Sequence, residues 1–362
     1  MTVTTPAPTL AQLTTLGVGG PARRYVETRT EAELIAAVVA ADAAGDPLLV
    51  LGGGSNVLVH DAGFDGVVVR DLRDALEVPD HSACAGITLV APAGAPWDAV
   101  VRYAVAGDLT GVEALSGIPG SVGATPVQNV GAYGQEVAQT IAVVRVWDRG
   151  RGRVRTLPLS DLRFGYRTSV LKASMRPDPA DPRAPWGPTP RYVVLDVTFQ
   201  LRKASLSRPI AYPELAAALG VAVGERAPLA QVRAAVLALR AGKGMLLDDA
   251  DPDTRSAGSF FTNPVLDASA AAALPADAPR FEAGDGRVKT SAAWLIDRAG
   301  FARGFGLPGP AAVSTKHVLA LTNRGGASAE DLLALARTVR DGVQAVFGVR
   351  LEVEPVLVGV EL

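Results

Sequence analysis

The chain has 362 residues, 48% of them hydrophobic, and a formal net charge of −2 at pH 7. This length exceeds what a single hydrophobic core usually serves, so we expect a globular protein with at least two lobes. The balanced charge and the lack of a Lys/Arg block argue against nucleic acid or an anionic membrane surface as a partner.

Helix and strand signals are intermixed along the chain, which predicts an α+β fold. Thr30 and Glu33 form a capping box and Gly45 is a stop signal, so residues 31–44 should form a helix before a buried strand at 48–51. Apolar and β-branched runs predict further strands, and apolar residues at helical spacing predict further helices. These strands are at 66–70, 87–91, 142–148, 191–201, 317–323 and 349–358, and the helices at 96–106, 228–241, 290–299 and 329–346.

The helix at 329–346 has the clearest boundaries, because Ser328 can cap its start and Gly348 can end it. Its apolar residues form one stripe that should face a core. The stripe consists of Leu332, Ala336, Val339, Val343 and Val346. Two segments rich in proline or alanine, 175–190 and 266–280, are expected to be exposed loops instead.

The few cysteines and histidines predict neither disulfides nor a metal site. Cys84 is the single cysteine, and His60, His81 and His317 have no ligand-type spacing. Residues 1–12 lack a basic and apolar signal pattern, and no run approaches the roughly 20 apolar residues of a membrane span. We therefore expect a cytoplasmic protein.

Residues Gly111–Gly134, GVEALSGIPGSVGATPVQNVGAYG, contain six glycines and two prolines. Glycine permits positive φ and close backbone approach, whereas proline fixes φ and removes a donor. This composition is incompatible with a long regular helix or strand. It predicts a shaped loop that receives a large ligand.

A second glycine-rich segment, Gly52-Gly53-Gly54-Ser55-Asn56, follows the strand expected at 48–51. Successive backbone N–H groups there can converge into an anion site suited to a pyrophosphate. A tight turn that requires unusual φ values explains the same residues equally well. Two dinucleotide-type glycine patterns, at 17–22 and 304–309, lack the strand-turn-helix context and are not expected to bind phosphate.

Seven motifs occur in a fixed order along the chain, and together they are far more specific than any one alone. They are GGGSNVLV (52–59), IPGSVGATPVQNVGAYG (118–134), FGYR (164–167), GSFFTNP (258–264), AAWLIDRAG (292–300), STKH (314–317) and LEVEPVLVG (351–359). From about Leu16 to Gly359, the sequence closely resembles the UDP-N-acetylenolpyruvoylglucosamine reductases, the MurB family.

The resemblance implies an FAD-binding domain of the PCMH or vanillyl-alcohol-oxidase type, built from two α+β subdomains, and an α+β domain that binds the UDP-sugar. The FAD domain would span 1–203, with subdomains at about 1–66 and 67–203, and would be completed by 348–362. The substrate domain would span 204–347.

FAD is expected to bind non-covalently, with its pyrophosphate at 52–56 and the remainder wrapped by 111–134. The family's cofactor contacts can be carried over to matching residues. They are Gly52, Gly53, Gly54, Ser55, Asn56, Ile118, Pro119, Gly120, Ser121, Gly123, Ala124, Thr125 and Gly131, with Tyr166 and Arg240 near the flavin.

The implied reaction is the NADPH-dependent reduction of UDP-N-acetylglucosamine enolpyruvate to UDP-N-acetylmuramate, a step of peptidoglycan precursor synthesis. By resemblance, Arg167 would stabilise the enolate, Ser259 would protonate the enol carbon, and Glu354 would assist Arg167. Taken singly, these residues also fit a surface arginine, a turn serine and a solvent-facing glutamate. Pro355, next to Glu354, predicts a strand end or edge.

Four further residues match the family's substrate site. Lys243 would meet the diphosphate, Asn263 and His317 would line the site, and Tyr212 would fold over the uridine diphosphate. Tyr212 also places the chain in the longer subtype of the family. Each residue has an alternative interpretation: Lys243 as an exposed charge at a helix end, Tyr212 and Asn263 as loop residues, and His317 as a hydrogen-bonded core histidine.

Two other functions stay open at this stage. A related FAD oxidase of a small alcohol or sugar would explain the cofactor loops alone, and oxygen would rapidly reoxidise its flavin. A non-catalytic nucleotide-sugar binding protein would lack flavin absorbance. We expect a monomer for the reductase.

Overall fold

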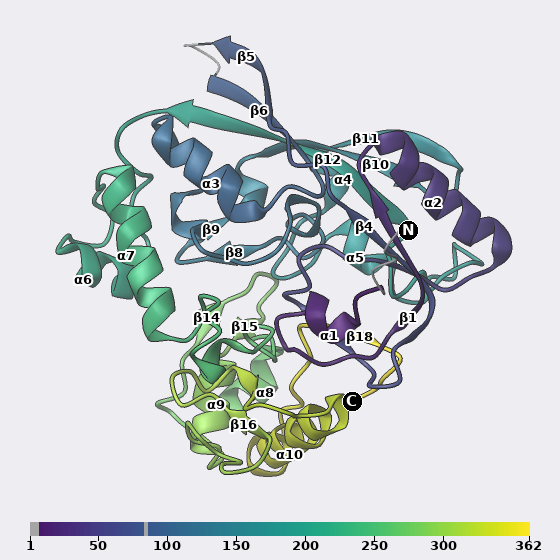
Figure 1. Ribbon diagram of the computed structural model, residues 1–362. Coiled ribbons are helices and arrows are strands. Elements are labelled where there is room, and N and C mark those ends of the chain that lie inside the picture. The colour runs from purple at the N-terminus through teal and green to yellow at the C-terminus, as the bar shows by residue number, and fades with distance from the viewer. Residues whose placement is uncertain (1–6, 83–85) are drawn as a thin grey trace. The chain divides into compact units, whose positions relative to one another are not determined.

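The computed structural model describes residues 7–82 and 86–362, which form two compact units (Figure 1). Unit 1 comprises residues 7–21, 55–64 and 243–362, and unit 2 comprises the described residues of 22–54 and 65–242. Cys84 lies outside the described residues, as does the side chain of His81.

Unit 2 is built on an antiparallel sheet with strand order β11-β10-β12-β6-β5. Helix α3 packs on this sheet (Figure 1). The Trp97 ring of α3 and the Phe199 ring of β12 lie 5.7 Å apart between centroids. The elements are β5 (Glu77–Ser82), β6 (Gly86–Pro92), α3 (Trp97–Ala106), β7 (Leu109–Thr110), β10 (Ile141–Asp148), β11 (Arg153–Pro158), α4 (Leu159–Leu162), α5 (Val170–Ala173) and β12 (Tyr192–Lys203).

A smaller sheet of unit 2, with order β1-β4-β2, carries the first glycine-rich segment at the end of β2. Its apolar face buries Leu34 and Val38 of α2. The cap predicted for α2 is present, since Thr30 accepts from the N–H of Glu33 and Gly45 adopts a φ of 69°. The elements are β1 (Ala22–Thr28), α2 (Glu31–Ala44), β2 (Leu48–Val50) and β4 (Phe64–Asp71).

The second glycine-rich segment, Gly111–Gly134, has no long regular element, as predicted. One part of it packs on α7, where Ala114 joins a buried cluster with Val232 and Val236. The elements here are η1 (Glu113–Leu115), η2 (Val122–Ala124), β8 (Gly131–Ala132), β9 (Gln135–Glu136), η3 (Val137–Gln139), α6 (Pro213–Leu219) and α7 (Leu229–Gly242).

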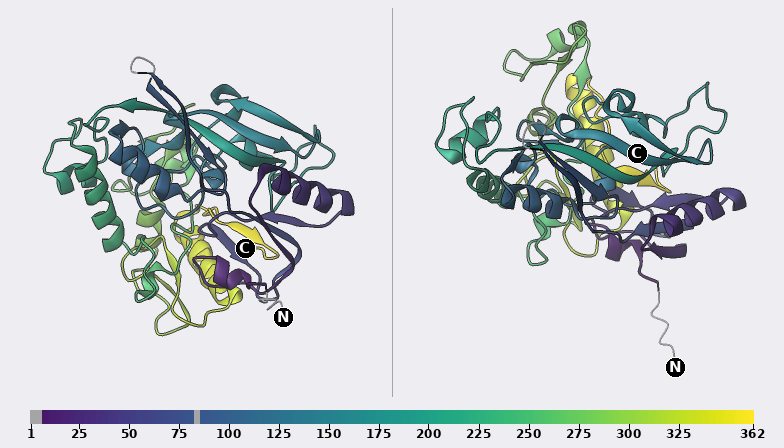
Figure 2. Two further views of the ribbon diagram at one scale, coloured as in Figure 1. Left: turned by 45° about the horizontal axis from the view of Figure 1, so that its top comes forward. Right: turned by 90° about the horizontal axis from the view of Figure 1, so that it is seen from above.

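In unit 1, one face of helix α10, the long yellow-green helix in Figure 2, is buried in a hydrophobic core. Residues of α9 and Phe260 belong to the same core. Strand β18 pairs in parallel with β3, directly after the first glycine-rich segment. The elements are α1 (Leu10–Leu13), β3 (Val57–Val59), η4 (Pro252–Thr254), β13 (Val265–Leu266), α8 (Ala268–Ala273), β14 (Phe281–Glu282), β15 (Val288–Lys289), α9 (Ala292–Arg298), β16 (Ala311–Val313), β17 (Leu321–Asn323), α10 (Ala329–Phe347) and β18 (Val356–Val358).

Most predicted elements match within two residues at each end, but four expectations were wrong. Only Val356–Val358 of the strand expected at 349–358 is a strand, and only Leu321–Asn323 of the one at 317–323. The supposed loop at 266–280 contains α8, followed by the buried Leu274. In α10, Val346 is 57% exposed, whereas the next residue, Phe347, packs against the core, so Val346 lies off the buried face of the helix.

The compact units differ from the predicted domain boundaries. Residues 204–242 belong to unit 2, where α7 packs against the glycine-rich segment. Residues 7–21 and 348–362 belong to unit 1. The assignment of 1–203 to FAD and 204–347 to substrate therefore stays a prediction about function.

Candidate functional site

The two glycine-rich segments touch each other within unit 2, where Gly52 and Gly53 lie against Ser121 and Gly120. A Cβ on Gly53 would lie 2.6 Å from the Cα of Gly120, and one on Gly52 would lie 2.4 Å from the Oγ of Ser121. The Gly53 distance excludes any side chain, because the neighbouring atom is backbone, whereas a side chain at Gly52 would require Ser121 to move. The predicted cofactor residues at 52–54 and 120–121 thus form one continuous surface of closely packed backbone.

A turn ahead of α3 fixes the second segment in place. Trp97 N donates to the carbonyl of Gly120 (3.0 Å), and Val122 N donates to the carbonyl of Ala95 (2.8 Å). Gly123 N donates to Ala93 O (2.9 Å) in the same manner. These backbone hydrogen bonds give a flexible sequence a defined path.

Glu113 is fully buried and anchors the start of the second segment. Its carboxylate accepts hydrogen bonds from Gly111 N (2.6 Å), Thr110 Oγ1 (3.1 Å) and Gln135 Nε2 (3.0 Å). It also accepts from the backbone of Arg208 (3.2 Å). A buried carboxylate needs such partners to offset its lost hydration, so Glu113 is a structural centre of the loop.

Arg167 is held against the end of the same segment. It has a positive φ of 52°, and its Nη2 donates to the carbonyl of Gly131 at 3.0 Å. The buried Asn129 donates to Gly165 O (3.2 Å) and accepts from Ala138 N (3.2 Å), so it ties FGYR to the loop. Arg167 is half-buried, which does not fit a freely exposed arginine.

The two residues expected near the flavin differ in exposure. Tyr166 is exposed, and the Arg167 guanidinium lies 6.0 Å from the centre of its ring. Arg240 projects from α7, and its Nε donates to Gly117 O at 3.2 Å. Burial lowers the pKa of Arg240 from its ordinary value, because desolvation disfavours the charged form. This guanidinium is therefore half-buried and partly desolvated beside the loop.

Tyr212, the proposed tyrosine over the uridine diphosphate, is the N-cap of α6 and is exposed. Its ring packs edge-on against Tyr133 with centroids 5.5 Å apart. Tyr133 belongs to the end of the glycine-rich segment. Unit 2 thus brings Tyr212 next to the predicted cofactor loop.

Ser259 and Glu354 lie on neighbouring backbone stretches of unit 1. Glu354 N donates to Phe260 O at 2.9 Å, so Glu354 is hydrogen-bonded to the residue that directly follows Ser259. Ser259 is half-buried, while Glu354 is only 8% exposed and is therefore not on a solvent face. Pro355 directly precedes β18, which confirms the strand end predicted there.

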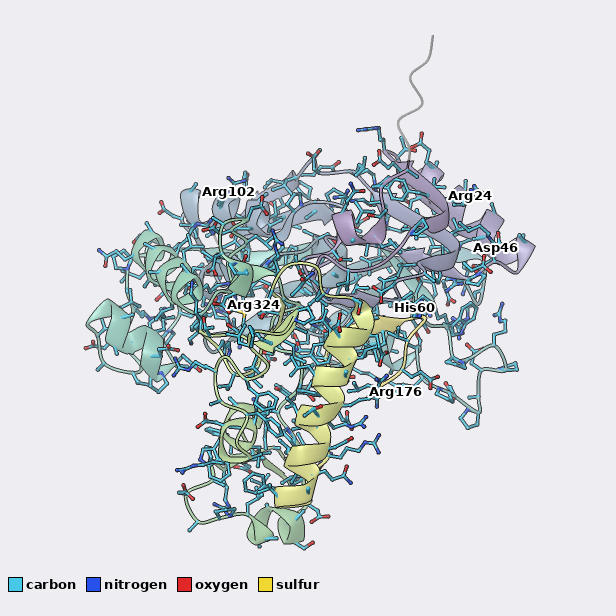
Figure 3. All side chains as sticks on the ribbon, turned by 60° about the horizontal axis from the view of Figure 1, so that its bottom comes forward. Arg24, Asp46, His60, Arg102, Arg176 and Arg324 are labelled. Carbon is cyan, nitrogen blue, oxygen red and sulfur yellow. The ribbon has the colours of Figure 1, made fainter. Side chains whose placement is uncertain are left out.

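Asn56, the last residue of the first glycine-rich segment, connects to this pair. Its Nδ2 donates to Glu354 O at 3.4 Å, and its carbonyl accepts from Val356 N at 3.0 Å. Neighbouring His60, labelled in Figure 3, accepts from Ala62 N at 3.0 Å through Nδ1.

The predicted substrate residues of unit 1 lie on three connected segments. Asn263 accepts from the N–H of Ala292 at 2.9 Å, at the start of α9. His317 is half-buried in the turn between β16 and β17, and its N–H donates to Ser314 Oγ at 3.2 Å. Lys243 is half-buried where the chain leaves α7.

Asp253, which the sequence did not single out, organises the path from Lys243 to Ser259. Its carboxylate accepts from Thr315 N (2.8 Å), Thr315 Oγ1 (2.5 Å) and Arg324 Nη1 (2.7 Å), the last labelled in Figure 3. A Cβ on Gly244 would lie 3.1 Å from the Cβ of Asp253. This buried carboxylate thus joins the segment after Lys243 to STKH.

Other supporting residues were missed too, and one of them had a sequence signal. Glu113 is the only charged residue between Gly111 and Gly134, so it stands out in the sequence, but its burial depends on partners that the sequence does not show. Asp253 had no comparable signal, since it is one of several acidic residues in its stretch. In the two described ranges, no group of three or more His, Cys, Asp or Glu side chains could hold a metal ion.

Comparison with known proteins agrees with this arrangement. Residues 22–158 match the model of the FAD binding domain, and residues 251–358 match that of the UDP-N-acetylenolpyruvoylglucosamine reductase C-terminal domain. Relatives named UDP-N-acetylenolpyruvoylglucosamine reductase include one from Thermobifida fusca (53% identical, covering 98% of this chain and 97% of the relative) and one from Nocardia farcinica (56%, 98% and 89%). The chain belongs to the UDP-N-acetylenolpyruvoylglucosamine reductase family.

A crystal structure of the family member from Thermus caldophilus, described as MurB, is 27% identical and covers 97% of both chains with a TM-score of 0.62. The expected α+β fold, with an FAD-binding domain and a family-specific C-terminal domain, is thus confirmed. No helix among the described residues of this reductase is long and apolar enough to cross a membrane.

The glycine-rich surface of this reductase fits FAD, the cofactor that the domain match identifies. The backbones lie against each other at Gly53 and Gly120 with no side chain between them, and an elongated dinucleotide needs close approach to backbone of this kind. Arg240 adds a positive charge beside the same loop, which suits an anionic cofactor.

Proposed function

We propose that the protein reduces UDP-N-acetylglucosamine enolpyruvate to UDP-N-acetylmuramate with NADPH, as a step of peptidoglycan precursor synthesis. The observation that carries this proposal is the similarity to reductases of that substrate at 53–56% identity over 98% of the chain. The chemistry that bound FAD would supply is hydride transfer from NADPH to the enolpyruvyl double bond.

A related FAD oxidase is not favoured. That alternative was based on the cofactor loops alone, whereas the family match extends through residues 251–358. Ser259 and Glu354 lie in this part of the chain.

Arg167 is proposed to stabilise the negative charge that develops when the substrate accepts a hydride. A guanidinium stays charged at neutral pH and presents a fork of donors to a carboxylate. The bond from Arg167 to Gly131 O supports this role, because it limits the positions that the side chain can take.

Ser259 is proposed to give its hydroxyl proton to the enol carbon, and Glu354 to assist Arg167. A serine is a weak acid, so its transfer requires nearby groups that stabilise the alkoxide. The hydrogen bond between Glu354 N and Phe260 O supports a shared role for the two residues, because it holds their backbones together.

The remaining substrate contacts are proposals of the same kind. Lys243 would meet the diphosphate, Tyr212 would cover the uridine diphosphate, and Asn263 and His317 would complete the site. The close connection of Lys243 and STKH through Asp253 supports a common ligand for that part. We further propose a cytoplasmic monomer, in which 1–203 serve FAD and 204–347 serve the UDP-sugar.

Ser259→Ala tests the function and the catalytic assignment together. We expect the unaltered enzyme to consume NADPH when given the enolpyruvyl UDP-sugar. In the variant, flavin reduction by NADPH should keep its rate, because proton donation belongs to the second half-reaction. Flavin reoxidation by substrate should slow by about 10²- to 10⁴-fold. Stopped-flow absorbance measures both steps.

Ser269→Ala is the matched control, since Ser269 lies on α8 and its hydroxyl donates to Asp267. It should change neither half-reaction. Equal damage to both half-reactions in Ser259→Ala would contradict the proton-donor role. No NADPH consumption by the unaltered enzyme would contradict the proposed function itself.

A further inference from the structure

Gly117 is clamped on both of its polar groups just before the segment that is expected to contact the flavin. Its N–H donates to Asp98 Oδ1 at 2.7 Å, and its carbonyl accepts from Arg240 Nε at 3.2 Å. It has a φ of 70°, a conformation that favours glycine. The residues that follow directly, Ile118–Gly120, are therefore attached to a point fixed by side chains from two helices.

Asp98 is itself held by Arg233 in a two-pronged ion pair. Arg233 Nη1 donates to Oδ1 at 2.8 Å, and Nη2 donates to Oδ2 at 2.7 Å. The Arg233 side chain is 15% exposed and the Asp98 side chain is 34% exposed, so the pair is partly shielded from water. Asp98 lies in the first turn of α3.

The arrangement makes α7 the support of the loop. Arg233 and Arg240 are seven residues apart, about two helical turns, so they share one face of α7. One arginine holds Gly117 through Asp98 and the other holds it directly. Burial by itself would raise the pKa of Asp98, but the hydrogen bonds from Arg233 and Gly117 lower it overall, so the carboxylate is charged at neutral pH.

We propose that Asp98 and Arg233 are positioning residues for FAD, which fix Gly117 and so hold Ile118–Gly120 in the cofactor-binding conformation. A loop rich in glycine loses much conformational freedom when it binds a ligand. Fixing one end of it before binding reduces that loss and raises affinity. This inference rests on the assignment of FAD as cofactor, and neither residue is among the contacts inferred from the family.

The test compares Asp98→Asn and Arg233→Gln with Asp42→Asn in the full chain. Asp42, on α2, forms a similar two-pronged pair with Arg149, and α2 carries none of the expected flavin contacts. Each protein is freed of flavin and titrated with FAD. Flavin fluorescence gives the Kd, the absorbance spectrum reports the flavin environment, and thermal unfolding without FAD reports stability.

Asp98→Asn and Arg233→Gln should each raise the Kd for FAD about 10- to 100-fold, the range for one lost charge-assisted hydrogen bond. The double variant should bind FAD no more weakly than the weaker-binding of the two single variants, because both residues act through Gly117. Arg233→Lys keeps the charge but not the fork, so it should give an intermediate Kd. Asp42→Asn should leave the Kd unchanged.

The inference is overturned if Asp98→Asn binds FAD with the unaltered Kd and spectrum. It is equally overturned if Asp42→Asn weakens FAD as much, since general destabilisation would then explain the loss. If Asp98→Asn does not fold, an unaltered Kd for FAD in both Arg233→Lys and Arg233→Gln would overturn the inference instead. Failure of the unaltered protein to bind FAD would instead contradict the cofactor assignment as well.

Discussion

At the scale of single residues, buried carboxylates hold the predicted site segments in place. Asp253 accepts three hydrogen bonds from Thr315 and Arg324, while Glu113 accepts hydrogen bonds within and beside the glycine-rich loop. Neither residue is among those assigned to chemistry. Their role is to give flexible segments one conformation, because a buried charge is tolerated only with its full set of partners.

Asp253→Asn should lower the free energy of unfolding by about 2 to 4 kcal/mol at neutral pH, because Arg324 and Thr315 lose a buried anionic partner. The Michaelis constant for the UDP-sugar should also rise, since Thr315 precedes His317. Denaturant unfolding and steady-state kinetics measure the two effects. Asp277→Asn is the control, because the Asp277 pair with Arg298 is exposed and should contribute little.

The difference in unfolding free energy between the unaltered protein and Asp253→Asn should depend on pH through the pKa of Asp253. Burial alone would raise that pKa, but the hydrogen bonds from Thr315 and the charge of Arg324 lower it overall. The stabilisation is therefore complete above the unfolded-state pKa of about 3.9 and is lost as the pH falls through the folded-state pKa. A stability difference between Asp253→Asn and the unaltered protein that grows below pH 4 would contradict this account.

The candidate catalytic residues could be predicted from the sequence, whereas their supports could not. Ser259 and Glu354 stand in distinctive motifs, so a resemblance identifies them directly. The partners of Asp253 lie 62 and 71 residues away in sequence, and nothing in the local pattern indicates them. Such long-range pairs are visible only after folding.

At the scale of elements, local sequence signals predicted a helix correctly where a capping residue, an apolar stripe and a terminal glycine agree. Helices α2 and α10 begin at the predicted caps and end at Gly45 and Gly348. The errors fall where packing decides instead. Residues 349–355 read as a strand because they alternate, yet regular pairing with β3 begins only at Val356. Helix α8 was missed because its alanine-rich sequence resembles a linker.

Two valines on α10 test whether the helix is held by its buried face. Val343 is fully buried, whereas Val346 is 57% exposed. Val343→Ala should lower the free energy of unfolding by about 1 to 3 kcal/mol, because it leaves a cavity in the core. Val346→Ala should change it by less than about 0.5 kcal/mol. Equal effects in denaturant titrations would show that α10 packs differently.

At the scale of the whole molecule, the candidate residues divide between the two units. Unit 2 carries Arg167, Tyr212 and the glycine-rich surface, while unit 1 carries Ser259 and Glu354. The motif order predicted the fold and the cofactor, because seven ordered motifs restrict the family strongly. The unit boundaries were not predicted, because residues 7–21 and 348–362 pack with 243–347, and residues 204–242 pack with the rest of unit 2.

The central claim is that FAD links NADPH oxidation to reduction of the enolpyruvyl UDP-sugar. Anaerobic absorbance spectra of the purified protein test it most directly, with NADPH added first and the UDP-sugar second. The account predicts a yellow protein that bleaches with NADPH and regains its colour when the UDP-sugar is added. A colourless protein, or a bleached flavin that recovers only when oxygen is admitted, would contradict it.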